Sequence, residues 1–138
     1  MKYLCIILFL FVCGISDLRK RTVNTSLCLM VSIAGIIAHI VKNESIGMNW
    51  GMGVVLGILF LGIAIMTREK IGLGDGFVIL AMGICLGGVE SFRIVVWAFL
   101  LCTVWAVLGI SIFKMSARSR IPFVPFLAIA SVVQLVFQ

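Results

Sequence analysis

Long apolar runs alternate with short polar interruptions along this chain of 138 residues. A helix that crosses a bilayer needs roughly 20 mostly apolar residues, because it rises about 1.5 Å per residue across about 30 Å of hydrocarbon. The pattern therefore predicts about six transmembrane helices, of which the first, fourth and sixth are short. Their expected bounds are about 3–16, 23–41, 50–67, 75–89, 92–113 and 121–137. The segment "ESFR" at 90–93 is expected to be a loop in which Glu90 is solvated.

The composition excludes an ordinary soluble domain. The chain is 63% hydrophobic and 12% charged, with a mean hydropathy of +1.30, whereas a soluble domain carries about 25% charged residues. We therefore expect an all-α, polytopic integral membrane bundle, with residues 1–138 forming one transmembrane domain in the lipid bilayer. The first segment is expected to be a retained helix, because no small-x-small cleavage site follows it.

Basic residues are concentrated in alternate loops. The first, third and fifth loops carry Arg19, Lys20 and Arg21, then Arg68 and Lys70, then Lys114, Arg118 and Arg120. Positive residues mark the cytoplasmic side of a membrane protein, so we expect both termini outside the cytoplasm. Topology and anionic lipid account for the net charge of +6, so nucleic-acid binding is not indicated.

The two aspartates of the chain, Asp17 and Asp75, lie at the ends of apolar runs that face the same side. An aspartate deep in a membrane helix costs roughly 2.5–3.5 kcal/mol, which makes such a residue a functional-site candidate. Asp75 by itself also fits a helix cap. Asp17 fits that interpretation less well, because it faces the negative end of its own helix unless a cation such as Arg19 or Arg21 offsets it. A paired site is therefore favoured over two unrelated caps.

Glycines surround the second aspartate in the stretch Gly72-Leu73-Gly74-Asp75-Gly76. Glycine permits positive φ and close backbone approach, so we expect an extended, exposed backbone there, suited to receiving a peptide. Two further pairs, Gly53/Gly57 and Gly83/Gly87, have the small-xxx-small spacing of packed membrane helices.

Three motifs in order resemble the type IV prepilin peptidases, which are GxGD-type aspartic membrane proteases. They are "DLRKRTVN" at 17–24, "GLGD" at 72–75 and "IPFVPFL" at 121–127, and the resemblance runs from about Gly14 to the C-terminus. It implies that Asp17 and Asp75 are catalytic, with no metal or organic cofactor. It also implies substrates that are pilin or pseudopilin precursors, cut after a short basic leader at the cytoplasmic membrane face. Residues expected to bind substrate or shape the site are Gly72, Gly74, Gly76, Arg19, Pro122 and Pro125.

Two departures from the family pattern concern substrate preference. Val23-Asn24-Thr25 stands where the family usually has Ile-Pro-Asn, and Phe77 stands where many members have lysine. The N-terminal region with paired CxxC motifs, typical of larger methylating members, is absent, so the chain resembles the short, stand-alone peptidases. Its five cysteines all fall within predicted spans, without a CxxC pair, and are interpreted as small apolar residues.

Two close carboxylates resist joint ionisation and share a proton. The helix-dipole argument favours Asp75 as the ionised member and Asp17 as the proton carrier. His39 lies towards the opposite end of its segment and is interpreted as structural. Two alternatives remain open, a noncatalytic pilus-assembly factor in the membrane and a small proton- or cation-coupled transporter. The sequence alone identifies neither the pilin partner nor the oligomeric state.

Overall fold

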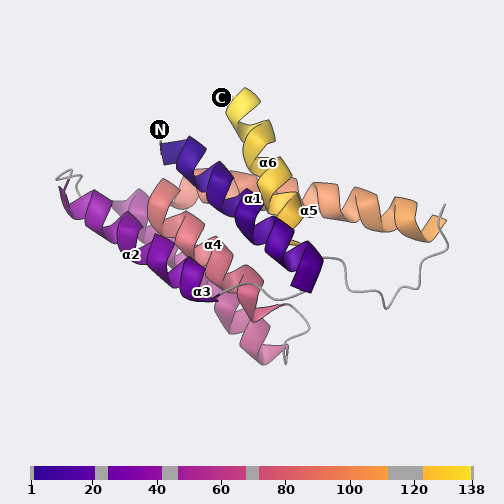
Figure 1. The fold of residues 1–138 in the computed structure, drawn as a ribbon, viewed down its shortest axis with the longest axis horizontal. Coiled ribbons are helices and arrows are strands. Elements are labelled where there is room, and N and C mark those ends of the chain that lie inside the picture. Colours follow the sequence, from indigo (N-terminus) through magenta and orange to yellow (C-terminus); the bar gives the residue numbers. More distant parts are fainter. Residues whose placement is uncertain (1, 21–24, 42–46, 68–71, 112–122, 138) are drawn as a thin grey trace.

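All the elements of the computed structural model are α-helices over the residues that it describes, 2–20, 25–41, 47–67, 72–111 and 123–137 (Figure 1). The helices are α1 (Lys2–Lys20), α2 (Thr25–Val41), α3 (Met48–Met66), α4 (Leu73–Leu86), α5 (Gly88–Ser111) and α6 (Val124–Val136). Each apolar run of the sequence thus corresponds to one helix. The all-helical prediction is confirmed for the described part of the chain.

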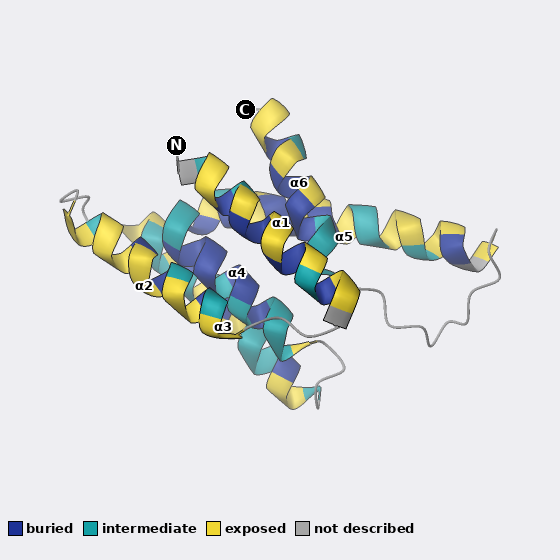
Figure 2. Cartoon of the chain, in the orientation of Figure 1, coloured by how far each residue is buried: buried dark blue, intermediate teal, exposed yellow. Residues whose placement is uncertain are grey.

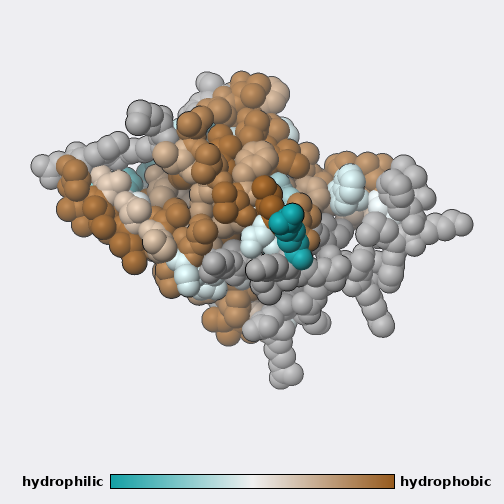
Figure 3. Space-filling view, in the orientation of Figure 1, coloured by the Kyte–Doolittle hydropathy of each residue, from teal (hydrophilic) through white to brown (hydrophobic). Residues whose placement is uncertain are grey.

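Two of these helices are long and apolar enough to cross a membrane, over Met48–Met66 and Gly88–Gly109. The helices Thr25–Val41, Leu73–Leu86 and Val124–Val136 are apolar but shorter. Many large apolar side chains point outward, among them Leu8, Met30, Val55 and Leu100, and the described residues on the face shown in Figure 3 are mostly hydrophobic. An extensive exposed apolar surface marks contact with a membrane or a partner, in keeping with a membrane protein. A passage of all six helices through the bilayer remains a prediction.

Helix α4 is the centre of the bundle, since α1, α2, α3 and α5 all pack against it. Half of its length is buried, including Val78, Ile79 and Met82, whereas the outward faces of α1 and α2 are exposed (Figure 2). Burial on several sides explains why α4 carries no polar face. It follows that the first turn of α4, where Asp75 lies, is held firmly by its neighbours.

Glycines bring α3 and α4 into backbone contact. A Cβ atom on Gly53 would overlap the carbonyl oxygen of Gly83, and one on Gly83 would overlap that of Gly53. One turn further along, Gly57 lies directly against Leu80. Small residues are what allow membrane helices to approach this closely. The packing role expected of Gly53, Gly57 and Gly83 is therefore confirmed.

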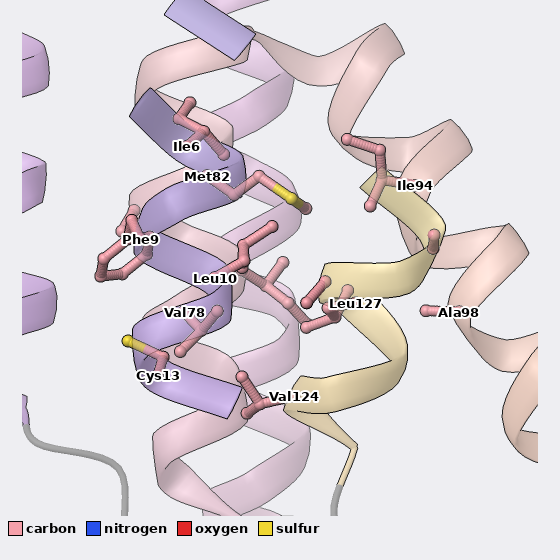
Figure 4. Close-up of a cluster of buried hydrophobic side chains, with 14 of the residues drawn as sticks. Ile6, Phe9, Leu10, Cys13, Val78, Met82, Ile94, Ala98, Val124 and Leu127 are labelled. Atoms are coloured by element: carbon pink, nitrogen blue, oxygen red, sulfur yellow. The ribbon is translucent and has the colours of Figure 1, made fainter. Parts of the chain in front are cut away.

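Helices α1 and α6 form a second, antiparallel pair. Their shared core includes Leu10, Val124 and Leu127, each fully buried, and Figure 4 shows these side chains pointing into the space between the two helices. Cys13 points to the other side of α1, away from α6 (Figure 4). The C-terminal end of α1 therefore meets the N-terminal end of α6.

The prediction of a loop at 90–93 is wrong, because these residues are helical. Helix α4 ends at Leu86, and Gly87 alone makes the break, with a φ of +88° that favours glycine. Helix α5 begins at Gly88, so Glu90 lies in its first turn, 3.5 Å from Arg93, and accepts a hydrogen bond of 3.1 Å from Gln134 Nε2 of α6. Polar residues there belong to a paired helix face, so Glu90 is partly buried instead of solvated.

Candidate active site

Asp17 lies within the last turn of α1, because that helix continues to Lys20, beyond the expected end at about residue 16. The residue is 8% exposed, a low value for an aspartate. Arg19, one of its two proposed partners, is exposed and two positions away, and residues two apart on a helix do not face each other. Arg19 is therefore not placed to balance the carboxylate. The other, Arg21, lies outside the described residues.

The partner of Asp17 comes from α6 instead. The backbone N–H of Val124, the first residue of α6, donates to the Asp17 carboxylate. Burial raises the pKa of the Asp17 carboxyl, and the Val124 N–H opposes that rise by stabilising the ionised form. The negative end of the α1 dipole, taken alone, favours a protonated Asp17. The positive end of α6 faces the same carboxylate and favours its ionised form, so the α1 dipole does not decide the protonation state.

Asp75 is the third residue of α4 and is partly buried. Gly72 is the N-cap residue, and its carbonyl oxygen accepts a hydrogen bond of 3.0 Å from the Asp75 N–H. A Cβ on Gly72 would lie 3.4 Å from Asp75 Oδ2, so the carboxylate folds back towards the cap. The aspartate thus sits at the positive end of a helix that is itself the centre of the bundle.

The fold brings the two aspartates together. The negative charge of Asp17 acts on the Asp75 carboxyl, so α1 and α4 hold these side chains within electrostatic reach of each other. Both lie at the same end of the bundle, where α1 ends and where α4 and α6 begin (Figure 1). The structure thus places both aspartates at one end of the bundle, and their pairing in one catalytic site stays a prediction.

Cysteines lie near both aspartates, which the sequence did not indicate. The thiols of Cys13 and Cys28 contact each other between α1 and α2, and the charge of Asp17 acts on Cys13. The charge of Asp75 acts on Cys102 of α5. All five cysteines are free thiols. A carboxylate in such surroundings is poorly hydrated, so its interaction with the second carboxylate is strengthened.

The glycines around Asp75 do not form the extended segment that was expected. Gly72 is extended, with φ −61° and ψ 129°, but the chain is helical from Leu73 onward. Gly74 is partly buried in the first turn, and Gly76 is buried, where a Cβ would come 2.8 Å from Leu61 Cδ2. Gly76 therefore allows α3 to lie close to the Asp75 turn and does not open the backbone to solvent.

The remaining expected site residues have mixed outcomes. Pro125 is the second residue of α6, at the same end of the bundle as the aspartates, and is partly buried. Pro122, Val23 and Asn24 lie outside the described residues. Phe77 packs against the hydrophobic core.

His39, interpreted as structural, is near the other end of α2, with its ring centroid 6.1 Å from that of Trp50 in an edge-on arrangement. Over the described ranges, no group of three or more His, Cys, Asp and Glu side chains could hold a metal ion. Two carboxyl groups that interact electrostatically, Asp17 and Asp75, lie at the opposite end of the bundle. Such a pair can hold one proton between two sites and can act as acid and base at once.

Comparison with known proteins gives one match. The model of the type IV leader peptidase family matches residues 4–107, which include both aspartates and about three quarters of the chain. No curated protein and no solved structure matches the chain.

Proposed function

Because the chain belongs to the type IV leader peptidase family, we propose that it is a membrane aspartic endopeptidase acting on prepilin-like precursors, either type IV pilins or pseudopilins. Asp17 and Asp75 form its catalytic pair. The observation that carries the proposal is that α1 and α4 bring the two aspartates of the chain within electrostatic reach at one end of the bundle.

The proposed reaction is hydrolysis of one peptide bond. The ionised carboxylate takes a proton from a water molecule as the water attacks the scissile carbonyl carbon, while the protonated carboxyl donates to the developing oxyanion. Collapse of the tetrahedral intermediate breaks the C–N bond, and a proton passes to the leaving amine. The two carboxyl groups supply both acid and base, so the proposal needs no metal or organic cofactor.

The proposed location is the cytoplasmic face of the cell membrane, with six helices crossing the bilayer and both termini outside. The basic residues of the first, third and fifth loops support this orientation. The aspartates lie at the ends of α1 and α4 that adjoin two of these loops. A precursor with a basic leader before its apolar segment would present the scissile bond at that membrane edge. Gly72, Gly74 and Pro125 are proposed to shape the place where it binds.

Co-expression with candidate pilin precursors tests the proposal, with leader removal followed by gel shift and mass spectrometry. The wild type should cleave, and Asp17→Asn and Asp75→Asn should each lower the rate by roughly 10²–10⁴-fold or more, because each removes a proton acceptor or donor. The matched control is Glu90→Gln. It also neutralises a partly buried carboxylate, but in the first turn of α5, where α4 ends, and it should cleave normally.

Cleavage that survives either aspartate substitution at the wild-type rate would rule out the paired mechanism. Absence of cleavage by every form, with each protein present in the membrane, would favour the two alternatives. Proton flux into vesicles would then identify a transporter, and its absence would leave a noncatalytic assembly factor.

A further inference from the structure

We propose that the first turn of α6 is a positioning element of the active site. In this inference the backbone N–H of Val124 holds Asp17 in its ionised form, so that Asp17 is the base and Asp75 carries the shared proton. This assignment rests on the proposed peptidase function, and it reverses the roles expected from the dipoles of α1 and α4 alone.

In the first turn of α6, the backbone N–H of Val124 is available to donate to Asp17. Phe123 occupies the N-cap position and makes no side-chain cap hydrogen bond. The N–H groups of Phe126 and Leu127 both donate to the Phe123 carbonyl oxygen, at 3.0 and 3.2 Å. Pro125 has no N–H to give. Val124 is therefore the residue of this turn whose amide is directed to the carboxylate of another helix.

Close packing holds that amide in place. A Cβ on Gly14, one turn before Asp17, would lie 3.4 Å from the Pro125 Cα, so α1 and α6 are in near-backbone contact here. Val124 is completely buried, and its side chain points towards α1 (Figure 4). The Asp17 carboxylate thus accepts a hydrogen bond from the first turn of α6, which the Phe123 side chain does not cap. In return, the Val124 N–H gives Asp17 a hydrogen-bond donor.

Asp75 has different surroundings. Its own N–H is engaged by Gly72, and among the described residues no donor reaches its carboxylate. Burial disfavours the ionised form of both carboxyls, but in the described part of the chain only Asp17 has an N–H donor that offsets this effect, and Asp75 lies beside a second negative charge. The shared proton is therefore assigned to Asp75.

Among the residues that the structure describes, the other titratable groups near Asp17 do not favour a different assignment. Cys13 on α1 and Cys28 on α2 share their contact with each other, and Asp75 faces Asp17 from α4. Arg19 is exposed on the same turn of α1. The sequence Val124–Val136 of α6 contains no titratable side chain. The contribution of α6 is consequently the backbone amide itself.

Replacing Val124 by proline removes this N–H at the first position of a helix, a position that proline often occupies. Val124→Ala is the matched control, because it also truncates the buried side chain but keeps the N–H. Because Phe123 is in the αR region, which a following proline disfavours, the yield of membrane-inserted protein is compared first. The pH profile of leader cleavage is measured for both. Loss of a hydrogen bond to the charged form raises the pKa of Asp17, so the acidic limb for Val124→Pro should move up by about one pH unit relative to Val124→Ala.

An acidic limb at the same pH in both variants would overturn the proposal, and so would movement of the alkaline limb alone. Failure of the wild type to cleave any precursor would instead refute the peptidase function, so the two failures are distinguishable.

A second measurement needs no substrate and no Val124 variant. Infrared difference spectra of the purified protein in lipid, near neutral pH, show the C=O band of a protonated carboxyl. This band should be lost in Asp75→Asn. In Asp17→Asn it should remain but disappear at a lower pH than in the wild type, because the charge of Asp17 no longer favours a protonated Asp75. The opposite pattern would assign the proton to Asp17 and overturn the inference.

Discussion

The two aspartates are held by two different kinds of helix interface. Asp75 is carried by α4, which lies against α3 with Gly53 and Gly83 in backbone contact. Asp17 is carried by α1, which meets α6 through buried side chains such as Leu10 and Leu127 and through the Val124 amide. The α3–α4 interface fixes the position of Asp75, because its glycines leave no room for a side chain. The α1–α6 interface instead influences whether the Asp17 carboxyl is ionised.

This difference separates two requirements of a carboxylate pair. The distance between the carboxyl groups depends on where α4 lies in the bundle, and α4 is the helix with the most neighbours. Which of the two carboxyl groups is ionised depends on hydrogen-bond donors, and α6 provides such a donor to Asp17 only. Substitutions at the first interface should therefore change folding, and substitutions at the second should change pH dependence.

The largest expected effect is at the α3–α4 interface. In Gly83→Ala the new Cβ would overlap the backbone of Gly53, and the helices must separate, at a cost of about 3 kcal/mol. The matched control is Gly62→Ala in α3, because a Cβ there meets nothing within 4 Å. That change should stabilise the helix by less than about 1 kcal/mol. Thermal unfolding in detergent, together with the yield of membrane-inserted protein, measures both variants. Equal stability of the two would show that backbone contact does not position α4.

The sequence was sufficient to predict the helices and the packing glycines, because apolar runs and small-xxx-small spacing are local signals. It misplaced the boundary between α4 and α5. Glu90 and Arg93 look like loop residues, yet they pair with each other, and Glu90 accepts from Gln134 on a helix far along the chain. The actual break is Gly87, for which the small-xxx-small spacing predicts only a packing role. A hydrogen bond between residues that are far apart in the chain, such as Glu90 and Gln134, leaves no pattern in the local sequence.

The sequence also predicts that Asp17 and Asp75 lie on one side, because helix number and loop charge place both there, and the structure has both at one end of the bundle. It did not predict the donor to Asp17. A backbone N–H carries no residue-type signal, and Val124 is an apolar residue like its neighbours. Arg19 was the natural partner by charge, but the helical geometry of α1 turns it outward.

A smaller effect is expected at Asp17 itself. Burial raises the pKa of this carboxyl above its ordinary value of 3.8. Above pH 3.8 the unfolded chain loses its proton first, so the wild type loses stability as pH rises through the folded pKa. Asp17→Asn stays neutral and still accepts from the Val124 N–H. It should therefore unfold a few degrees higher than wild type at pH 7 while being inactive.

The difference in unfolding temperature between Asp17→Asn and wild type should disappear below pH 3.8, where both side chains are neutral. Arg19→Gln is the control, because it changes an exposed charge on the same turn and should show no such pH dependence. A lower unfolding temperature for Asp17→Asn at pH 7 would mean that the surroundings of Asp17 stabilise its charge more than burial opposes it.

The smallest effect is expected at the α1–α6 interface, where Gly14→Ala places a Cβ 3.4 Å from the Pro125 Cα and 3.6 Å from its nitrogen. These are ordinary van der Waals distances, so unfolding stability should change by less than about 1 kcal/mol. The acidic limb of cleavage should also stay in place, because the Val124 amide is not displaced. Gly14→Leu should push α6 away from Asp17 and move that limb upward, as Val124→Pro does. If Gly14→Ala were as damaging as Gly83→Ala, the two interfaces would be equally intolerant of a side chain, and the contrast between position and charge would fail.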